Sequence, residues 1–215
     1  MKKYYDDEYP PEEKYLYLIL FAPGYTKKFN EPIRGNTWLQ KQVHVLSKTI
    51  KNLGYEFDEH NFGAFSAPLG IVQIQNKSSG LIEQPPEDGP IRLTEKGLNA
   101  AKKIWQKTSF NERNVISQIK EFFNDMNYWE LISFSYSTFP ETTLKSEIRT
   151  DFQKHRINAA INLFKRKKLS LSKAIKVAGI SEEEFVKLLK KRGISPYSLD
   201  EETYKKSLDI IEGIT

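Results

Sequence analysis

The chain has 215 residues, no cysteine and a formal net charge of +5. This length allows one large domain or two small ones, each with a hydrophobic core. The lack of cysteine excludes disulfides, thiolate metal sites and a cysteine nucleophile. The longest apolar run, residues 15–23, is too short to span a bilayer, and residues 1–11 do not resemble a signal peptide. We therefore expect a soluble, cytoplasmic protein.

Positive charge is concentrated in one segment. Residues 145–192 contain fourteen Lys or Arg and five Asp or Glu, a net charge of +9, whereas residues 193–215 have a net charge of −3. A basic segment of this kind is typical of a region that contacts nucleic acid. A solvated lysine-rich surface without a ligand is the alternative.

The first half of the chain predicts helices and one β-hairpin after a flexible tail over residues 1–11. The spacing of apolar residues and the positions of Pro, Gly and the helix-capping Thr94 predict helices 12–21, 38–53 and 68–75, strands 80–84 and 91–94, and a helix 95–107. Three helices, a hairpin and a helix form the order of a winged-helix domain, which we place at residues 12–108.

This winged-helix-like domain is predicted to bind DNA poorly. Its third helix would read the groove, yet residues 67–76 contain no Lys or Arg. The hairpin tip contains Glu87 and Asp88, which would repel phosphate. We therefore expect the domain to contact protein, either a partner or the C-terminal half of the chain.

Connecting helices are predicted over residues 109–144, with helices at 111–125 and 128–138. Trp129, Phe134 and Tyr136 could form a base-stacking platform, but Lys and Arg are nearly absent around them, which favours core packing. A long helix is then predicted over residues 145–168, ending in four consecutive cations.

Residues 170–193 predict a helix-turn-helix. Apolar residues of the first helix lie on one face, and Gly179 allows the sharp turn. Ser181 and Glu184 predict a capping box at the start of the second helix, and Gly193 predicts its end.

Two parts of the chain resemble known families. R-G-N-T-W-L-Q-K at residues 34–41, F-G-A-F-S-A-P-L at 62–69 and G-L-I…L-T-E-K-G at 80–97 resemble motifs of the prokaryotic SocA/Panacea and YwgA-like proteins, over roughly residues 12–148. The resemblance implies a winged-helix-like regulator or antitoxin whose N-terminal domain binds a protein partner.

The second resemblance begins at about residue 157 and includes N-L-F-K-R-K-K-L-S-L-S-K-A-I-K-V-A-G-I-S-E-E-E-F-V-K-L-L-K-K-R-G-I at residues 162–194. This stretch resembles a small antitoxin-like helix-turn-helix family, related to VapB-type antitoxins. The family pattern is L-Y-x-x-G-K-[IL]-S-L-x-K-A-A-x-L-A-G-[IV]-S-x-x-E-F-L, often followed by an acidic tail. This chain departs from the pattern at Ile175, where the family has alanine, and at residues 165–168, which replace a turn containing glycine.

The candidate DNA-binding residues are the cations of the helix-turn-helix and of the run before it. They are Lys165, Arg166, Lys167, Lys168, Lys173, Lys176, Lys187, Lys190 and Lys191. Glu182, Glu183 and Glu184 oppose this reading, because the first residues of a recognition helix usually face base edges. Acidic residues are also favoured at any helix N-terminus, which explains them without DNA.

No catalytic residues, metal ligands or cofactors are predicted, and we expect no enzyme activity. Asp58, Glu59 and His60 could bind a metal, but a charged surface loop is the better interpretation. Arg149 and His155 loosely fit a pattern of HEPN-type ribonucleases, yet six helical residues place them on different faces.

The sequence therefore predicts a mainly α protein with a winged-helix-like N-terminal domain, a small β-hairpin wing, connecting helices, and a basic helix and helix-turn-helix domain over residues 145–215. The expected function is that of a DNA-binding transcriptional regulator, with antitoxin of a toxin–antitoxin pair as the narrower form. A protein-interaction adaptor without DNA affinity is the alternative. We expect double-stranded DNA, a toxin or other protein, and a second copy as partners. A candidate dimer seam consists of Leu208, Ile210, Ile211 and Ile214. Packing of these four residues into the core of their own C-terminal module is the alternative.

Overall fold

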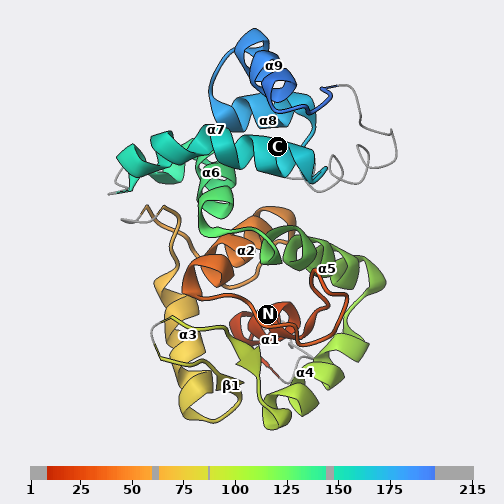
Figure 1. Cartoon of the computed structure of the whole chain (residues 1–215). Helices are drawn as coiled ribbons and strands as arrows, with labels where there is room; N and C mark the ends of the chain where they lie inside the picture. The colour runs from red at the N-terminus through yellow and green to blue at the C-terminus, as the bar shows by residue number, and fades with distance from the viewer. Residues whose placement is uncertain (1–8, 60–62, 87, 144–147, 197–215) are drawn as a thin grey trace. The chain divides into compact units, whose positions relative to one another are not determined.

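The computed structural model describes residues 9–59, 63–86, 88–143 and 148–196 (Figure 1). This part of the chain forms nine α-helices, a short 3-10 helix and one antiparallel pair of strands, which confirms the mainly α class with a β-hairpin. The chain divides into unit 1, residues 1–57 and 66–124, and unit 2, residues 58–65 and 125–215.

The order of elements in unit 1 is that of the predicted winged helix. Its elements are α1 (Pro11–Phe21), α2 (Asn36–Thr49), α3 (Ala67–Ser78), β1 (Ile82–Glu83), β2 (Arg92–Leu93), α4 (Glu95–Lys107) and α5 (Phe110–Asn124). Those of unit 2 are α6 (Tyr128–Thr138), η1 (Pro140–Thr143), α7 (Arg149–Lys165), α8 (Leu171–Ala178) and α9 (Glu182–Lys191). The helices predicted within the connecting segment thus belong to different units, α5 to unit 1 and α6 to unit 2.

Helix α1 is the centre of unit 1. Seven successive residues, from Tyr15 to Phe21, are buried, and the helix contacts α3, α4, α5 and β2. A helix enclosed on every side needs apolar residues on every side. This enclosure explains the continuous apolar run at residues 15–23.

The hairpin is shorter than the sequence predicted. Ile82 pairs with Leu93 and Glu83 with Arg92, and each strand has only two residues. Prolines at positions 85, 86 and 90 cannot donate to a strand ladder, so the connection between the strands leaves the pairing early. An isolated bridge between Ile33 and Ile91 extends the contact of this region with the loop before α2.

The tip of the hairpin has a structural task. The Asp88 carboxylate accepts a hydrogen bond of 2.7 Å from the Asn36 N–H in the first turn of α2. A carboxylate is favoured there because the N–H groups of a first helical turn have no partner within the helix. The Asp88 carboxylate, which was expected to repel phosphate, therefore stabilises the start of α2. Glu87 lies outside the described residues.

Helix α4 begins as predicted, with Thr94 as its cap. The Thr94 hydroxyl accepts a hydrogen bond of 3.2 Å from the Gly97 N–H. A Cβ atom on Gly97 would lie 2.1 Å from the carbonyl oxygen of Leu81. The L-T-E-K-G motif thus ends in glycine because α4 begins directly against the backbone before β1.

Unit 1 encloses basic side chains that no sequence pattern announced. Lys120 on α5 is fully buried and donates a hydrogen bond of 2.7 Å to the Leu20 carbonyl near the C-terminus of α1. Burial lowers the pKa of Lys120 to about 7. Lys41 on α2 is 3% exposed, and burial lowers its pKa to about 8. Both amines therefore sit where the charged form is destabilised.

In unit 2, α7 ends earlier than predicted. The helix ends at Lys165 rather than Lys168, because Lys167 adopts a left-handed φ of 58°. The Lys167 and Lys168 N–H groups donate to the carbonyls of Phe164 and Leu163, at 2.8 and 2.9 Å. These two bonds form a Schellman motif, which normally places glycine at the left-handed position. Residues 144–147, where the helix was expected to begin, lie outside the described residues.

Candidate nucleic-acid interface

The helix-turn-helix consists of α8, a sharp turn and α9. Gly179 ends α8 with a left-handed φ of 66°. The Ser181 hydroxyl accepts from the Glu184 N–H at 3.2 Å, while the Glu184 carboxylate accepts from the Ser181 N–H at 3.1 Å. Gly193, with φ of 69°, follows the end of α9. The predicted turn, capping box and helix end are confirmed.

Helix α7 closes the core of this motif. Phe185 and Leu189 on α9 are fully buried, and the Phe185 ring meets the Phe164 ring of α7 edge-on at 6.4 Å. Ala174 and Ala178 on α8 are also buried, and their small side chains allow close approach of the neighbouring helices. The module therefore has three helices, with the polar face of α9 directed to solvent.

Arg156 on α7 holds the end of α8. Its Nε donates to the Val177 carbonyl at 2.8 Å and its Nη2 to the Lys176 carbonyl at 3.3 Å. The guanidinium also lies 4.9 Å from the centre of the Phe152 ring. Ser137 on α6 donates to the same Val177 carbonyl at 3.3 Å. Together these donors satisfy carbonyls that the end of a helix leaves without partners.

A second arginine ties the end of α9 to α7. Arg192 donates through Nη2 to the Asn158 side-chain carbonyl at 2.7 Å. Sequence reasoning missed the roles of Arg156 and Arg192, because their partners lie 21 and 34 residues away. The sequence shows only that this segment is rich in arginine and lysine. It does not indicate which groups Arg156 and Arg192 contact.

The four cations at the end of α7 have different environments. Arg166 donates to the Glu130 carboxylate at 2.6 Å and to the Asp125 carboxylate at 3.0 Å, and Lys168 lies 2.7 Å from Asp125. The Glu130 and Asp125 side chains are 5% and 11% exposed. Two of the four predicted phosphate contacts are thus engaged with acids of the same unit. Lys165 and Lys167 are exposed.

The lysines of the helix-turn-helix itself lie mostly on its surface. Lys176, Lys187, Lys190 and Lys191 are exposed, and Lys173 is half-buried. Lys187, Lys190 and Lys191 lie on α9 after its acidic first turn. One face of this short helix therefore presents positive charge next to the polar backbone at its C-terminal end.

The acidic first turn of α9 is partly explained by local structure. The Glu184 carboxylate accepts from the Ser181 N–H and hydroxyl, so it serves the helix cap. Glu182 and Glu183 are exposed and have no such task among the bonds described. These two carboxylates are the part of the motif that least suits phosphate.

The central aromatics pack within unit 2. Phe134 and Tyr136 are 4% exposed, and the Tyr136 ring lies 5.4 Å from the buried Phe152 ring. Trp129 is half-buried and stacks on His155 with 4.0 Å between ring centres. Phe134 and Tyr136 are thus unavailable to stack on bases.

The described ranges contain no group of three or more His, Cys, Asp or Glu side chains that could hold a metal ion. His60, the third residue of the Asp58-Glu59-His60 loop for which a metal site was the less favoured interpretation, lies outside those ranges. None of the helices in the described part is both long and apolar enough to cross a membrane.

Comparison with known proteins concerns the C-terminal part of the chain. The model of an uncharacterised protein family, UPF0175, matches residues 138–213, and this family is linked to antitoxin-like proteins. The matched segment includes α7, α8 and α9, and covers a little over a third of the chain. The comparisons give no support to the resemblance of residues 12–148 to the SocA/Panacea and YwgA-like proteins. No curated protein matches the chain.

Proposed function

We propose that this chain is a DNA-binding transcriptional regulator that contacts duplex DNA through α9 and the exposed lysines around it. The observation that carries the proposal is a closed three-helix module whose solvent face is cationic. Residues 148–196 contain thirteen Lys or Arg and four Asp or Glu, a net charge of +9. A second helix that projects from such a module is the element that enters the major groove in helix-turn-helix proteins.

The contacts divide into two groups by position. Lys187 and Lys190 lie one and two turns beyond the start of α9, where they can reach base edges. Lys165, Lys167 and Lys191 lie at helix ends and suit phosphate contacts. Arg166 and Lys168 hold the carboxylates of Asp125 and Glu130 instead, so we assign them to the stability of unit 2.

The narrower role is that of the antitoxin of a toxin–antitoxin pair, in which the protein also binds a toxin. The antitoxin-like family that matches residues 138–213 supports this role. In this role the protein has no catalytic activity. It acts as a dimer, because one helix-turn-helix covers a single half-site. The predicted seam, Leu208, Ile210, Ile211 and Ile214, lies outside the described residues. A monomer mass by light scattering, unchanged on addition of DNA, would contradict the dimer.

A protein-interaction adaptor is the second candidate, and Glu182 and Glu183 favour it. Both carboxylates lie in the exposed first turn of α9, where a DNA-reading helix usually faces base edges. In this role the same surface would bind a protein whose own surface accommodates these two carboxylates, and it would have no affinity for DNA duplexes.

The test is fluorescence anisotropy of the full chain with a pool of labelled duplexes, at about 50 and about 200 mM salt. Replacing Lys165 and Lys167 together with Ala should weaken binding to all duplexes. It should also flatten the slope of log K against log salt by about 0.9 for each lost phosphate contact. Arg166 and Lys168 stay in place, because removing them would leave buried carboxylates unpaired.

The other variants separate base reading from repulsion. Lys190→Ala should relax sequence preference, at a cost of about 1–3 kcal/mol for the preferred duplex. Replacing Glu182 and Glu183 with Gln should strengthen non-specific binding, while Ser181 and Glu184 keep the cap. Lys102→Ala, at an exposed lysine of α4, is the matched control and should change nothing. If none of the unit 2 variants alters DNA affinity, the adaptor function replaces the regulator function.

A further inference from the structure

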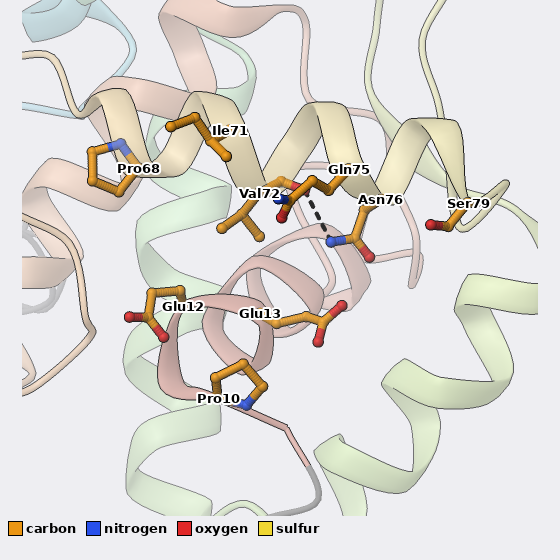
Figure 2. Close-up of a pocket in the computed structure, with 9 residues that line it drawn as sticks. All are labelled: Pro10, Glu12, Glu13, Pro68, Ile71, Val72, Gln75, Asn76 and Ser79. Carbon is orange, nitrogen blue, oxygen red and sulfur yellow. Dashed lines mark hydrogen bonds between the residues drawn. The ribbon is translucent and has the colours of Figure 1, made fainter.

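Unit 1 has an open groove between the N-terminus of α1 and one side of α3 (Figure 2). Its volume is about 390 Å³. One wall is apolar and consists of Pro68, Ile71 and Val72 of α3, while Glu12 and Glu13 of α1 face it from the other side. The groove therefore combines a hydrophobic wall with a pair of carboxylates.

The apolar wall continues onto the surface of α3. Ile71 is 55% exposed, and Ile74, one turn further on, is 66% exposed. Residues at positions 68, 71 and 74 are spaced by three and lie along one side of a helix. Large β-branched side chains exposed in a row cost free energy in water unless a partner covers them. In a winged helix this is the helix that would read DNA, and between its first residue and Asn76 it has no cation.

The polar floor of the groove is already engaged within the protein. The Asn76 amide donates to the Val72 carbonyl at 2.9 Å, and its oxygen accepts from the Tyr17 hydroxyl. The Tyr17 hydroxyl also lies 3.2 Å from the Glu13 carboxylate. Burial and the charge of Glu13 raise the pKa of Tyr17, so the phenol keeps its proton. The floor thus offers few free polar groups to orient a small molecule, which small-ligand pockets usually do.

The carboxylates retain capacity for a cationic partner. Neither Glu12 nor Glu13 forms an ion pair with any cation in the described part of the chain. Three cations lie near the groove without lining it. Lys14 follows Glu13 on α1 and lies over the Tyr15 ring, Lys77 is in the last turn of α3, and Lys96 donates to the Ser79 carbonyl at the far end. The lining of the groove itself therefore has two carboxylates on the α1 side and no cation.

We infer that this groove is the docking site for an amphipathic helical segment of a partner protein, with leucine-like residues on one face and lysine or arginine along its edge. The apolar face would cover Ile71 and Ile74, and the cations would meet Glu12 and Glu13. Helix α3 has 12 residues, so a helix of similar length can lie along it. This inference does not depend on DNA binding by unit 2.

The test uses the full chain and a fluorescent synthetic helix of about 12 residues, the length of α3. The peptide has leucine at i, i+3, i+4 and i+7, lysine at the flanking positions and blocked ends. Binding is followed by anisotropy at low and high salt. Replacing Ile71 and Ile74 together with Ser should weaken binding by at least about tenfold, because the apolar contact is lost. Replacing Glu12 and Glu13 with Gln should weaken it several-fold at low salt and little at high salt.

Matched controls keep the effect specific. Phe110→Ser removes another exposed apolar side chain, which is 74% exposed at the start of α5, and Glu95→Gln removes a carboxylate from the first turn of α4. Both should leave binding within about twofold of the unsubstituted protein. A peptide with glutamate in place of lysine should bind at least about tenfold more weakly than the lysine peptide. A thermal melt of each variant checks that it is folded.

Three results would overturn the inference. The first is no binding of the lysine peptide, and the second is equal binding by the glutamate peptide. The third is a mass by light scattering that falls from dimer to monomer in the Ile71 and Ile74 variant, which would assign the groove to a second copy of this chain. DNA affinity measured on the same variants should stay unchanged, so failure here leaves the regulator proposal standing.

Discussion

At the scale of single residues, the end of α7 shows how backbone conformation sets residue choice. Lys167 has φ of 58°, close to the φ values of Gly179 and Gly193 at the ends of α8 and α9. A residue with a Cβ atom pays about 1 kcal/mol or more to adopt this conformation, whereas glycine does not. The antitoxin-like family pattern has glycine at this turn, so lysine at this position is less favourable for stability than glycine.

Lys167→Gly is therefore expected to stabilise unit 2. The gain should be about 0.5–1 kcal/mol, because relief of the left-handed conformation is partly offset by the greater freedom of glycine in the unfolded chain. Urea unfolding followed by circular dichroism measures it. Lys165→Gly is the control: this residue ends the helical part of α7, so glycine there should destabilise by up to about 1 kcal/mol. A Lys167→Gly protein less stable than the natural one would contradict the reading.

The residue scale also marks a limit of sequence reasoning. The nine predicted DNA-contacting cations were chosen for the positive charge of their segment and for their place in or just before the helix-turn-helix. Neither criterion can tell a cation that faces solvent from one that faces a carboxylate. Arg166 and Lys168 meet Asp125 and Glu130, which lie more than thirty residues earlier in the chain. No local pattern connects these positions, so only the fold of unit 2 separates structural cations from candidate DNA contacts.

At the scale of elements, prediction succeeded where the cause is local. The capping box of Ser181 and Glu184, the helix ends at Gly179 and Gly193 and the Thr94 cap all depend on residues within four positions of each other. The prediction was less accurate for the lengths of the strands, because the prolines at positions 85, 86 and 90 end the pairing early. It missed Arg156, whose guanidinium satisfies two carbonyls at the end of α8.

The turn of the helix-turn-helix offers an element-scale prediction. Gly179→Ala should destabilise unit 2 by about 2 kcal/mol or more, since the left-handed φ is unfavourable for alanine and the new methyl group must displace Arg156. A Cβ atom there would lie 2.2 Å from Nη2 of that arginine. The loss should be visible as a lower melting temperature and weaker DNA binding.

Gly193→Ala provides the matched control. Its φ of 69° is nearly the same, but no atom lies within 4 Å of the added Cβ. The variant should lose only the conformational term, about 1 kcal/mol. Equal losses at positions 179 and 193 would show that Arg156 does not hold the turn.

At the scale of the whole molecule, buried lysines couple the stability of unit 1 to pH. The pKa of Lys120 is about 7 and that of Lys41 about 8 in the folded chain, below the usual value near 10.5. At a pH between the lowered pKa of each lysine in the folded chain and the usual value near 10.5, the unfolded chain binds more protons than the folded one. The free energy of unfolding should therefore rise with pH in this range. The expected window is about pH 7.5 to 9.5, and each lysine contributes at most about 1.4 kcal/mol per pH unit.

Chemical unfolding across that window measures the slope. Lys120→Met should reduce the slope, since methionine fills a similar volume and has no proton to lose. Lys102→Met, at an exposed lysine of α4, should leave the slope unchanged. Stability that falls between pH 7.5 and 9.5 in the natural protein would mean that these amines remain charged in the core.

The chain passes between its two units three times, because residues 58–65 belong to unit 2 although unit 1 resumes at residue 66. Two domains joined end to end would be connected by a single crossing of the chain. Here a fragment of residues 125–215 alone would lack residues 58–65, which also belong to unit 2. During synthesis, residues 58–65 leave the ribosome well before the rest of their unit exists. Residues 58–65 can therefore pack with the rest of unit 2 only after α3, α4 and α5 have been synthesised. Unit 1 can fold earlier, while this segment of the chain has no partner from residues 125–215.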